Sequence, residues 1–307
     1  MKHILFVVFG LLISACTAES TPAPTITSTQ NLQLMATTST VMPTKSLKSP
    51  ISTPQPTIKN YQSPTPSPDP ADWKEWPVIP AVDPSLRAIY EYGQSLGNDP
   101  HAFSIFGDCQ TRPDEFFGVF ETDAVLFESL SPELRETVNN FKGSFNRESP
   151  TSQDGTTPGA LLWTQWHRGE YGCTFAETPV DCELRIRRPS FVIIQVGTHF
   201  ESRNTEYLRK IILQLMDAGV VPILATKADN RELDDRINRD MALLASEYDL
   251  PLWNFWAALS DLPDRGLYVM EGREEQGAVY LDEEASLRHR MTGLEVLNVV
   301  WRVVTGK

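Results

Sequence analysis

The chain has 307 residues, four cysteines and a formal net charge of −13 at pH 7. Nucleic-acid binding needs a basic footprint, so this charge argues against that class of protein, and equally against a basic surface that docks on membranes. No internal repeat is evident. About 235 residues remain after an N-terminal leader and a linker, which is enough for one sizeable domain.

The N-terminus has the pattern of a targeting signal. Lys2 and His3 precede an apolar run, Ile4–Ile13, that is too short to remain as a membrane-spanning helix. The segment Leu12–Cys16 resembles the lipobox of bacterial lipoproteins. The resemblance implies that residues 1–16 are a signal peptide and that an acylated Cys16 anchors the protein in the cell membrane, facing the extracytoplasmic side. The alternative is an ordinary secretory signal with an incidental cysteine.

Residues 17–72 are predicted to form a linker. They contain ten of the 23 prolines and no glycine, and Thr, Ser and Pro dominate. Such a segment cannot bury enough apolar surface to offset the entropy of ordering it, and its prolines keep it extended. We therefore expect a spacer between the membrane and a domain over residues 73–307.

The cysteines divide into three groups. Cys16 belongs to the leader. Cys173 and Cys182 lie close together in what reads as one irregular loop of an exported protein, which predicts a disulfide between them. Cys109 is then left without a partner, and an unpaired thiol in an oxidising compartment is a candidate for function.

The domain alternates strands and helices. Continuous apolar runs predict strands over 102–106, 190–196, 220–225 and 252–256. Helical spacing predicts helices over 83–97, 131–141, 205–218 and 232–248, and a last helix from 292. Strands separated by helices predict a three-layer α/β/α domain with a central parallel sheet.

In such a sheet, ligands bind beyond the carboxyl ends of the strands. The chain places polar residues at three of these ends: Asp108-Cys109, Thr198-His199, and the group Lys227, Asp229 and Asn230. A site is expected there, although the third group also fits an ordinary solvated loop.

These strand ends resemble the sequence blocks of the SGNH (GDSL-type) hydrolases. Gly107-Asp108-Cys109 matches the first block, and Gly155 or Gly159 the second. Gly197-Thr198-His199 stands at the third, and Glu271–Glu274 at the last. The resemblance implies a flavodoxin-like fold, ester hydrolysis, and an oxyanion hole that includes the N–H groups of residue 109 and the second-block glycine.

The chain departs from the family at the residues that carry the chemistry. Cys109 replaces the nucleophilic serine, and His199 replaces an asparagine. Glu271 and Glu274 stand where the family has the aspartate and histidine of its base, and Glu274 is a weak base that raises the pKa of a nearby thiol. His199 and His289 are the candidates to replace that base.

Structural roles compete with these functional ones. Cys109 fits a small buried residue, and His101, His167 and His199 fit structural histidines. The tryptophans at 163, 166, 253 and 256 are expected in the core more than as platforms for sugar rings. The histidine spacing suggests no metal ligands, and the sequence calls for no cofactor.

Two functions therefore remain. The first is a membrane-anchored SGNH-like hydrolase with eroded catalytic residues, acting on acetylated glycans or other small esters. The alternative is a non-catalytic surface lipoprotein that binds a glycan or another ligand in the same pocket. The oligomeric state is left open.

Overall fold

The computed structural model describes residues 69–307. Its centre is a four-stranded parallel sheet with the strand order β1-β2-β3-β4. The strands are β1 (Asp99–Gly107), β2 (Pro189–Gln195), β3 (Val221–Ala225) and β4 (Leu252–Trp253). Leu267–Tyr268 (β5) and Tyr280–Leu281 (β6) form a separate antiparallel pair. The leader with Cys16, and linker residues 17–68, lie outside the described residues.

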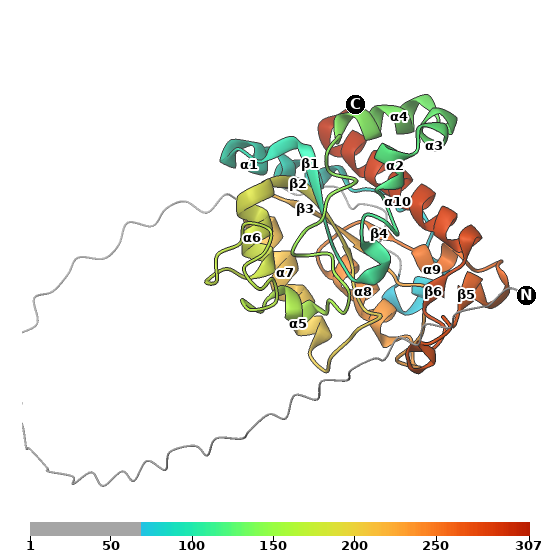
Figure 1. The fold of residues 1–307 in the computed structure, drawn as a ribbon. Helices are drawn as coiled ribbons and strands as arrows, with labels where there is room; N and C mark the ends of the chain where they lie inside the picture. The colour runs from blue at the N-terminus through green and yellow to red at the C-terminus, as the bar shows by residue number, and fades with distance from the viewer. Residues whose placement is uncertain (1–68) are drawn as a thin grey trace, which may run out of the picture. The chain divides into compact units, whose positions relative to one another are not determined.

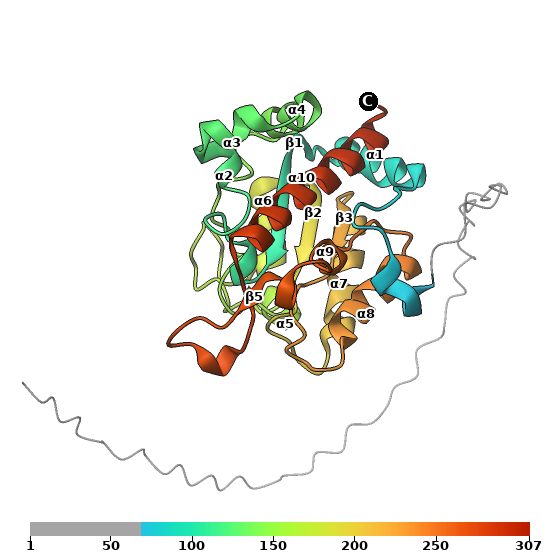
Figure 2. The same cartoon turned by 90° about the vertical axis from the view of Figure 1, so that its right-hand side faces the viewer.

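Helices pack on both faces of the sheet, as the alternation of elements predicts. Figures 1 and 2 show α10 and α4 on one side of the strands, with α6 and α7 on the other. The helices are α1 (Arg87–Leu96), α2 (Val119–Thr122), α3 (Ala124–Ser129), α4 (Pro132–Asn140), α5 (Pro158–Leu161), α6 (Pro179–Arg187), α7 (Asn204–Asp217), α8 (Arg236–Glu247), α9 (Phe255–Ala258) and α10 (Glu283–Thr305). Short 3-10 turns complete the list: Pro70–Glu75, Pro84–Leu86, Cys109–Thr111, Pro263–Gly266 and Glu274–Gln276.

The strands form where continuous apolar runs allow burial on both faces. Every residue of β2 and β3 is buried, which fits strands covered by helices on each side. On the edge of β1 that faces away from β2, Gly107 forms an isolated parallel β-bridge with Ser152. A short piece of chain from the irregular region 143–181 is thereby brought beside the carboxyl end of β1.

The last helix begins at Glu283, nine residues before the predicted start at Thr292, so that prediction was wrong. The side chain of Asp282 caps it by accepting from the N–H of Ala285 at 2.8 Å. Glu283 and Glu284 occupy the first turn, where negative charge favours a helix. The acidic run therefore marks a helix N-terminus, and His289 lies inside the helix.

The predicted disulfide is present, joining Cys173 to Cys182 with the Cα atoms 5.3 Å apart. The surrounding region is less irregular than predicted, because Cys182 lies on α6 rather than in a loop. A capping box between Thr178 and Asp181 starts that helix. The disulfide thus attaches the preceding loop to a helix that packs beside β1.

The described part of the chain begins just before the predicted domain boundary. Residues Pro70–Glu75 form a 3-10 turn whose Trp73 is buried and packs edge-on against Trp256 at 5.0 Å between ring centroids. Asn254 Nδ2 donates to the carbonyl oxygens of Trp73 and Trp76. This segment is therefore part of the domain. Among the described helices, none has the length and apolar character needed to cross a bilayer.

Candidate functional site

The carboxyl ends of β1, β2 and β3, here called the carboxyl edge, bring together the three predicted groups of polar residues. Parallel pairing of Gly107 with Gln195, and of Ile194 with Leu224, aligns these ends. Gly107 is required by a close approach: a Cβ there would lie 2.1 Å from Thr111 Oγ1. Its φ is not positive, so it serves packing rather than the sharp turn expected from the sequence.

Cys109 is a free thiol that is only partly exposed. Burial, and after it the carboxylates of Asp108 and Asp154, raise its pKa to about 12. No hydrogen bond within residues 69–307 joins its sulfur to a histidine. The thiol is therefore protonated at neutral pH, and no described histidine is hydrogen-bonded to it to remove the proton.

We expect Cys109 to react with iodoacetamide about 100-fold or more slowly than an ordinary cysteine at pH 8, because its thiolate is rare there. A Cys16→Ser background makes Cys109 the one thiol outside the disulfide. Asp154→Asn should speed the reaction, because it removes one carboxylate that raises the pKa of Cys109.

Asp114→Asn is the matched control for this experiment. Asp114 and Asp154 both pair with Arg112, at 3.1 and 3.3 Å, but only Asp154 acts on the pKa of Cys109. Alkylation of the starting protein at the rate of free cysteine, or equal rates for the two variants, contradicts this account of the thiol.

Asp108 is a buried carboxyl group at the same turn. Its Oδ1 accepts from the Gln110 N–H at 3.2 Å. Burial raises its pKa to about 7, and the neighbouring Asp229 acts in the same direction. Asp108 therefore titrates near neutral pH, which makes it the carboxyl group at this edge whose charge is most open to change.

Lys227 and Asp229 belong to a buried ionic cluster with Glu232. Lys227 Nζ donates to Asp229 Oδ1 at 2.6 Å and to Glu232 Oε2 at 2.5 Å. Thr198 donates from its hydroxyl to Asp229 Oδ2 at 2.8 Å. A solvated loop was the wrong alternative here, because the three ionic side chains satisfy one another away from water.

Asn230 lies outside this cluster. It is exposed, and its Oδ1 accepts from the N–H of Asp235 at 3.0 Å. The amide stabilises the turn that precedes α8, which begins at Arg236 rather than at the predicted 232. Asn230 therefore has a local structural role.

His199 lies at the end of β2 and is partly exposed. Burial lowers its pKa, and the guanidinium of Arg231 lowers it further. Its ring makes no hydrogen bond with the described residues. His199 thus supplies a neutral imidazole at the carboxyl edge at neutral pH, without the carboxylate partner that would orient it as a base.

His289 is fully buried inside α10. Its Nε2 lies 2.6 Å from Gln195 Oε1, and its ring stacks on Phe116 with centroids 4.1 Å apart. Because an amide oxygen only accepts, Nε2 carries the proton. Burial lowers its pKa to about 3. The one hydrogen bond of this ring within the described residues goes to Gln195, not to Cys109.

The backbone distinguishes the two candidates for the second block. The N–H of Gly159 donates to Glu201 Oε1 at 2.6 Å. Within residues 69–307, neither Gly155 nor Cys109 donates its backbone N–H to a backbone carbonyl or a side-chain oxygen. Gly155 has φ +79° and Gly197 has φ +142°, conformations that favour glycine.

Residues 271–274, the predicted counterpart of the last block, lie on the loop between β5 and β6. Glu271 and Glu274 are exposed, and Glu274 Oε1 accepts from the Gly272 N–H at 2.9 Å. Gln110 Nε2 donates to the Val279 carbonyl at 2.5 Å, which ties this loop to the Cys109 turn. A hydrogen bond to the Tyr280 hydroxyl raises the pKa of Arg273 on this loop.

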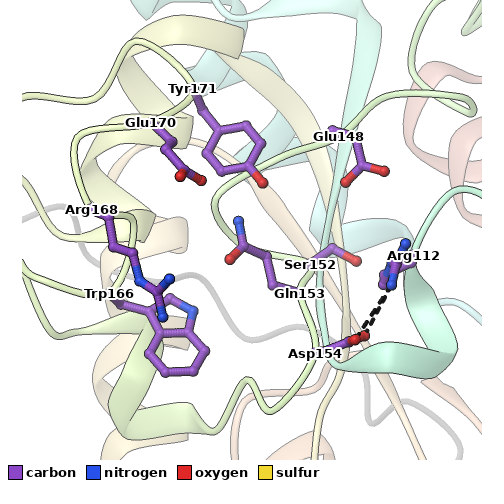
Figure 3. A pocket seen from close by; sticks show the side chains of 9 residues that line it. All are labelled: Arg112, Glu148, Ser152, Gln153, Asp154, Trp166, Arg168, Glu170 and Tyr171. Carbon is purple, nitrogen blue, oxygen red and sulfur yellow. Dashed lines mark hydrogen bonds and ion pairs between the residues drawn. The ribbon is translucent and has the colours of Figure 1, made fainter. Parts of the chain in front are cut away.

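Beside the Cys109 turn lies a cavity of about 300 Å³, lined by the nine side chains labelled in Figure 3. Arg112 and Asp154 link it to the turn. Trp166 lines this cavity, and Trp163 is 53% exposed, so the core location predicted for these two tryptophans was wrong. Trp253 is buried, as predicted. Sequence reasoning missed this cavity, because its walls come from loops without a periodic pattern.

Within residues 69–307, no three His, Cys, Asp or Glu side chains are grouped as a metal site requires. The chain was also compared with known proteins. No protein-family model matches it, and no curated protein is significantly similar to it.

Proposed function

We propose that this protein is a non-hydrolysing relative of the SGNH hydrolases, and that its carboxyl edge binds a ligand rather than cleaving one. The observation that carries the proposal is Cys109: a thiol with a pKa near 12, at the position of a nucleophile, with no histidine hydrogen-bonded to it among the described residues. A thiol in that state is a poor nucleophile.

Three features support the family assignment. The four blocks follow one another at strand ends and before the last helix. Counting the Gly107–Ser152 bridge as a rudimentary edge strand, the parallel order becomes that of flavodoxin-like sheets. Among the described residues, the backbone N–H groups of Cys109 and Gly155 have no carbonyl partner, as the two donors that the family uses for an oxyanion require.

The same site supports binding as the remaining activity. Glu274 occupies the position of the family's histidine and lies exposed in a loop, while His289 is committed to Gln195. Free N–H donors and the neighbouring cavity remain for a ligand. The lipobox resemblance at Cys16 and the Cys173–Cys182 disulfide support an exported, membrane-anchored location.

The full chain is expected to hydrolyse 4-nitrophenyl acetate no faster than its Cys109→Ala variant. Restoring the family residues in one protein, with Cys109→Ser, Glu271→Asp and Glu274→His, should raise the rate about 100-fold or more, since a positioned base contributes roughly that much. The control places the histidine one residue later, with Glu275→His in place of Glu274→His.

Two outcomes decide the proposal. Activity of the unmodified chain that Cys109→Ala abolishes would mean that the protein is an esterase. A restored variant no faster than its Glu275→His control would remove the support for the SGNH alignment of the last block.

A further inference from the structure

We propose that the cavity beside the Cys109 turn is a saccharide-binding site whose outer wall is the Trp166 loop, residues 163–173. This inference deepens the proposed function and rests on it, because it names the class of ligand that the carboxyl edge binds. The cavity contacts the edge through Ser152, which bridges to Gly107, and through the Arg112–Asp154 pair (Figure 3).

The Trp166 loop holds two cavity-lining residues in an unfavourable backbone conformation. Arg168 has φ +52° and Tyr171 has φ +58°, values that cost free energy in residues other than glycine. Both side chains line the cavity. Strain of this kind persists only where the surroundings impose it, and it gathers at ligand-binding positions.

Two fixed contacts impose this conformation. His167 is buried, accepts the Gly169 N–H at Nδ1, and donates from Nε2 to the Glu177 carbonyl, both at 2.9 Å. The disulfide from Cys173 holds the end of the loop against α6. The wall of the cavity is therefore in place before a ligand arrives, which lowers the entropic cost of binding.

The groups that line the cavity match a polyhydroxylated ligand. Trp166 and Tyr171 provide aromatic faces, and Gln153 provides both a donor and an acceptor. None of the nine lining side chains is aliphatic, which disfavours an acyl chain. The indole Nε1 of Trp166 is buried and has no hydrogen-bond partner among the described residues, which is uncommon for a buried donor.

The charges around the cavity favour a neutral sugar over an acidic ligand. Glu148, Asp154 and Glu170 contribute three carboxylates, against the guanidinium groups of Arg112 and Arg168. Arg112 is already paired with Asp154, so an anion would meet a net negative wall. A cavity of about 300 Å³ is at the lower end of the ligand-pocket range and suits a short saccharide.

The test titrates the full chain with glucose, galactose, N-acetylglucosamine and their β-linked trimers, measuring tryptophan fluorescence and ligand-observed NMR. We expect at least one probe to bind with a Kd of about 1 mM or tighter. Trp166→Ala should weaken that binding about 10-fold or more. Tyr171→Phe, which keeps the ring and removes the hydroxyl, should weaken it less.

Trp163→Ala is the matched control, because Trp163 lies on the same loop, is largely exposed and does not line the cavity. It should leave the Kd unchanged, and thermal unfolding checks that all variants are folded. Absence of binding by every probe overturns the inference, as does equal weakening by Trp163→Ala and Trp166→Ala. Either result leaves the esterase comparison intact, so failure of this inference and failure of the proposed function are distinguishable.

Discussion

Lys227→Met is expected to lower the free energy of unfolding by about 3–5 kcal/mol, because it leaves Asp229 and Glu232 buried without a countercharge. For a domain of this size, a loss of that magnitude corresponds to a fall in Tm of roughly 6–20 °C. The ammonium also donates to the Asp229 carbonyl at 3.0 Å, so no proton of Lys227 is left without a partner. Denaturant unfolding followed by circular dichroism measures the change.

Lys210→Met is the matched control, because its pair with Glu206 is exposed on α7. An exposed pair contributes little, and the unfolding midpoint should not move. Adding Asp229→Asn and Glu232→Gln to Lys227→Met should recover part of the loss, since the stranded charges are then neutral. Equal midpoints for Lys227→Met and Lys210→Met would show that the cluster does not stabilise the domain.

Asp108→Asn is expected to stabilise the domain at pH 8 and to have little effect near pH 4. The folded protein holds the pKa of Asp108 at about 7, against 3.8 for an ordinary aspartate. Because the folded value is the higher one, the stability contributed by this group is full below about pH 4 and is lost as the pH rises through 7. Three pKa units correspond to about 4 kcal/mol.

Asparagine suits this comparison because its Oδ1 still accepts from the Gln110 N–H while the group stays neutral. His289 contributes with the opposite sign: its folded pKa of about 3 is depressed, so its stability is present above about pH 6.5 and is lost as the pH falls. In the unmodified protein, the changes of unfolding free energy with pH that come from Asp108 and from His289 therefore partly cancel.

The measurement is therefore a difference between Asp108→Asn and the unmodified protein, taken by urea unfolding at each pH from 4 to 8. The difference should grow in favour of the variant as the pH rises. A difference that stays constant over this range would mean that Asp108 keeps an ordinary pKa in the folded protein.

The first three strands were predictable from the sequence because each is a continuous apolar run, as a core on both faces of a sheet requires. The fourth, predicted over 252–256, was wrong in extent: β4 spans only Leu252–Trp253, and α9 begins at Phe255. β3 was predicted at 220–225 and spans Val221–Ala225, and β2 agrees as closely. The start of α10 was not predictable from hydrophobic spacing, because its first turn is acidic and the Asp282 cap acts through one local hydrogen bond. That error left His289 outside the last helix, whereas it lies inside α10 and is buried in the core.

The candidate site was predictable in position more than in chemistry. Three strand ends with polar residues sufficed to locate the carboxyl edge, since parallel strands end together. Asp154 was missed because its partner, Arg112, lies on another segment of the chain. Glu232 was missed because the predicted helix over 232–248 included it, whereas α8 begins at Arg236 and Glu232 pairs with Lys227. The cavity and the Trp166 loop were not predicted, because the positive φ angles of Arg168 and Tyr171 occur at residues whose type does not indicate such a conformation.

The sequence by itself determined the α/β alternation, the disulfide pairing and the presence of Cys109 at a strand end, because each depends on local pattern or on the number of cysteines. Only the tertiary structure decided that the Cys109 thiol stays protonated, that Gly159 rather than Gly155 donates its N–H to a described residue, and that His289 donates to Gln195. These properties depend on burial and on charges and acceptors brought in from distant segments, which a linear pattern does not contain.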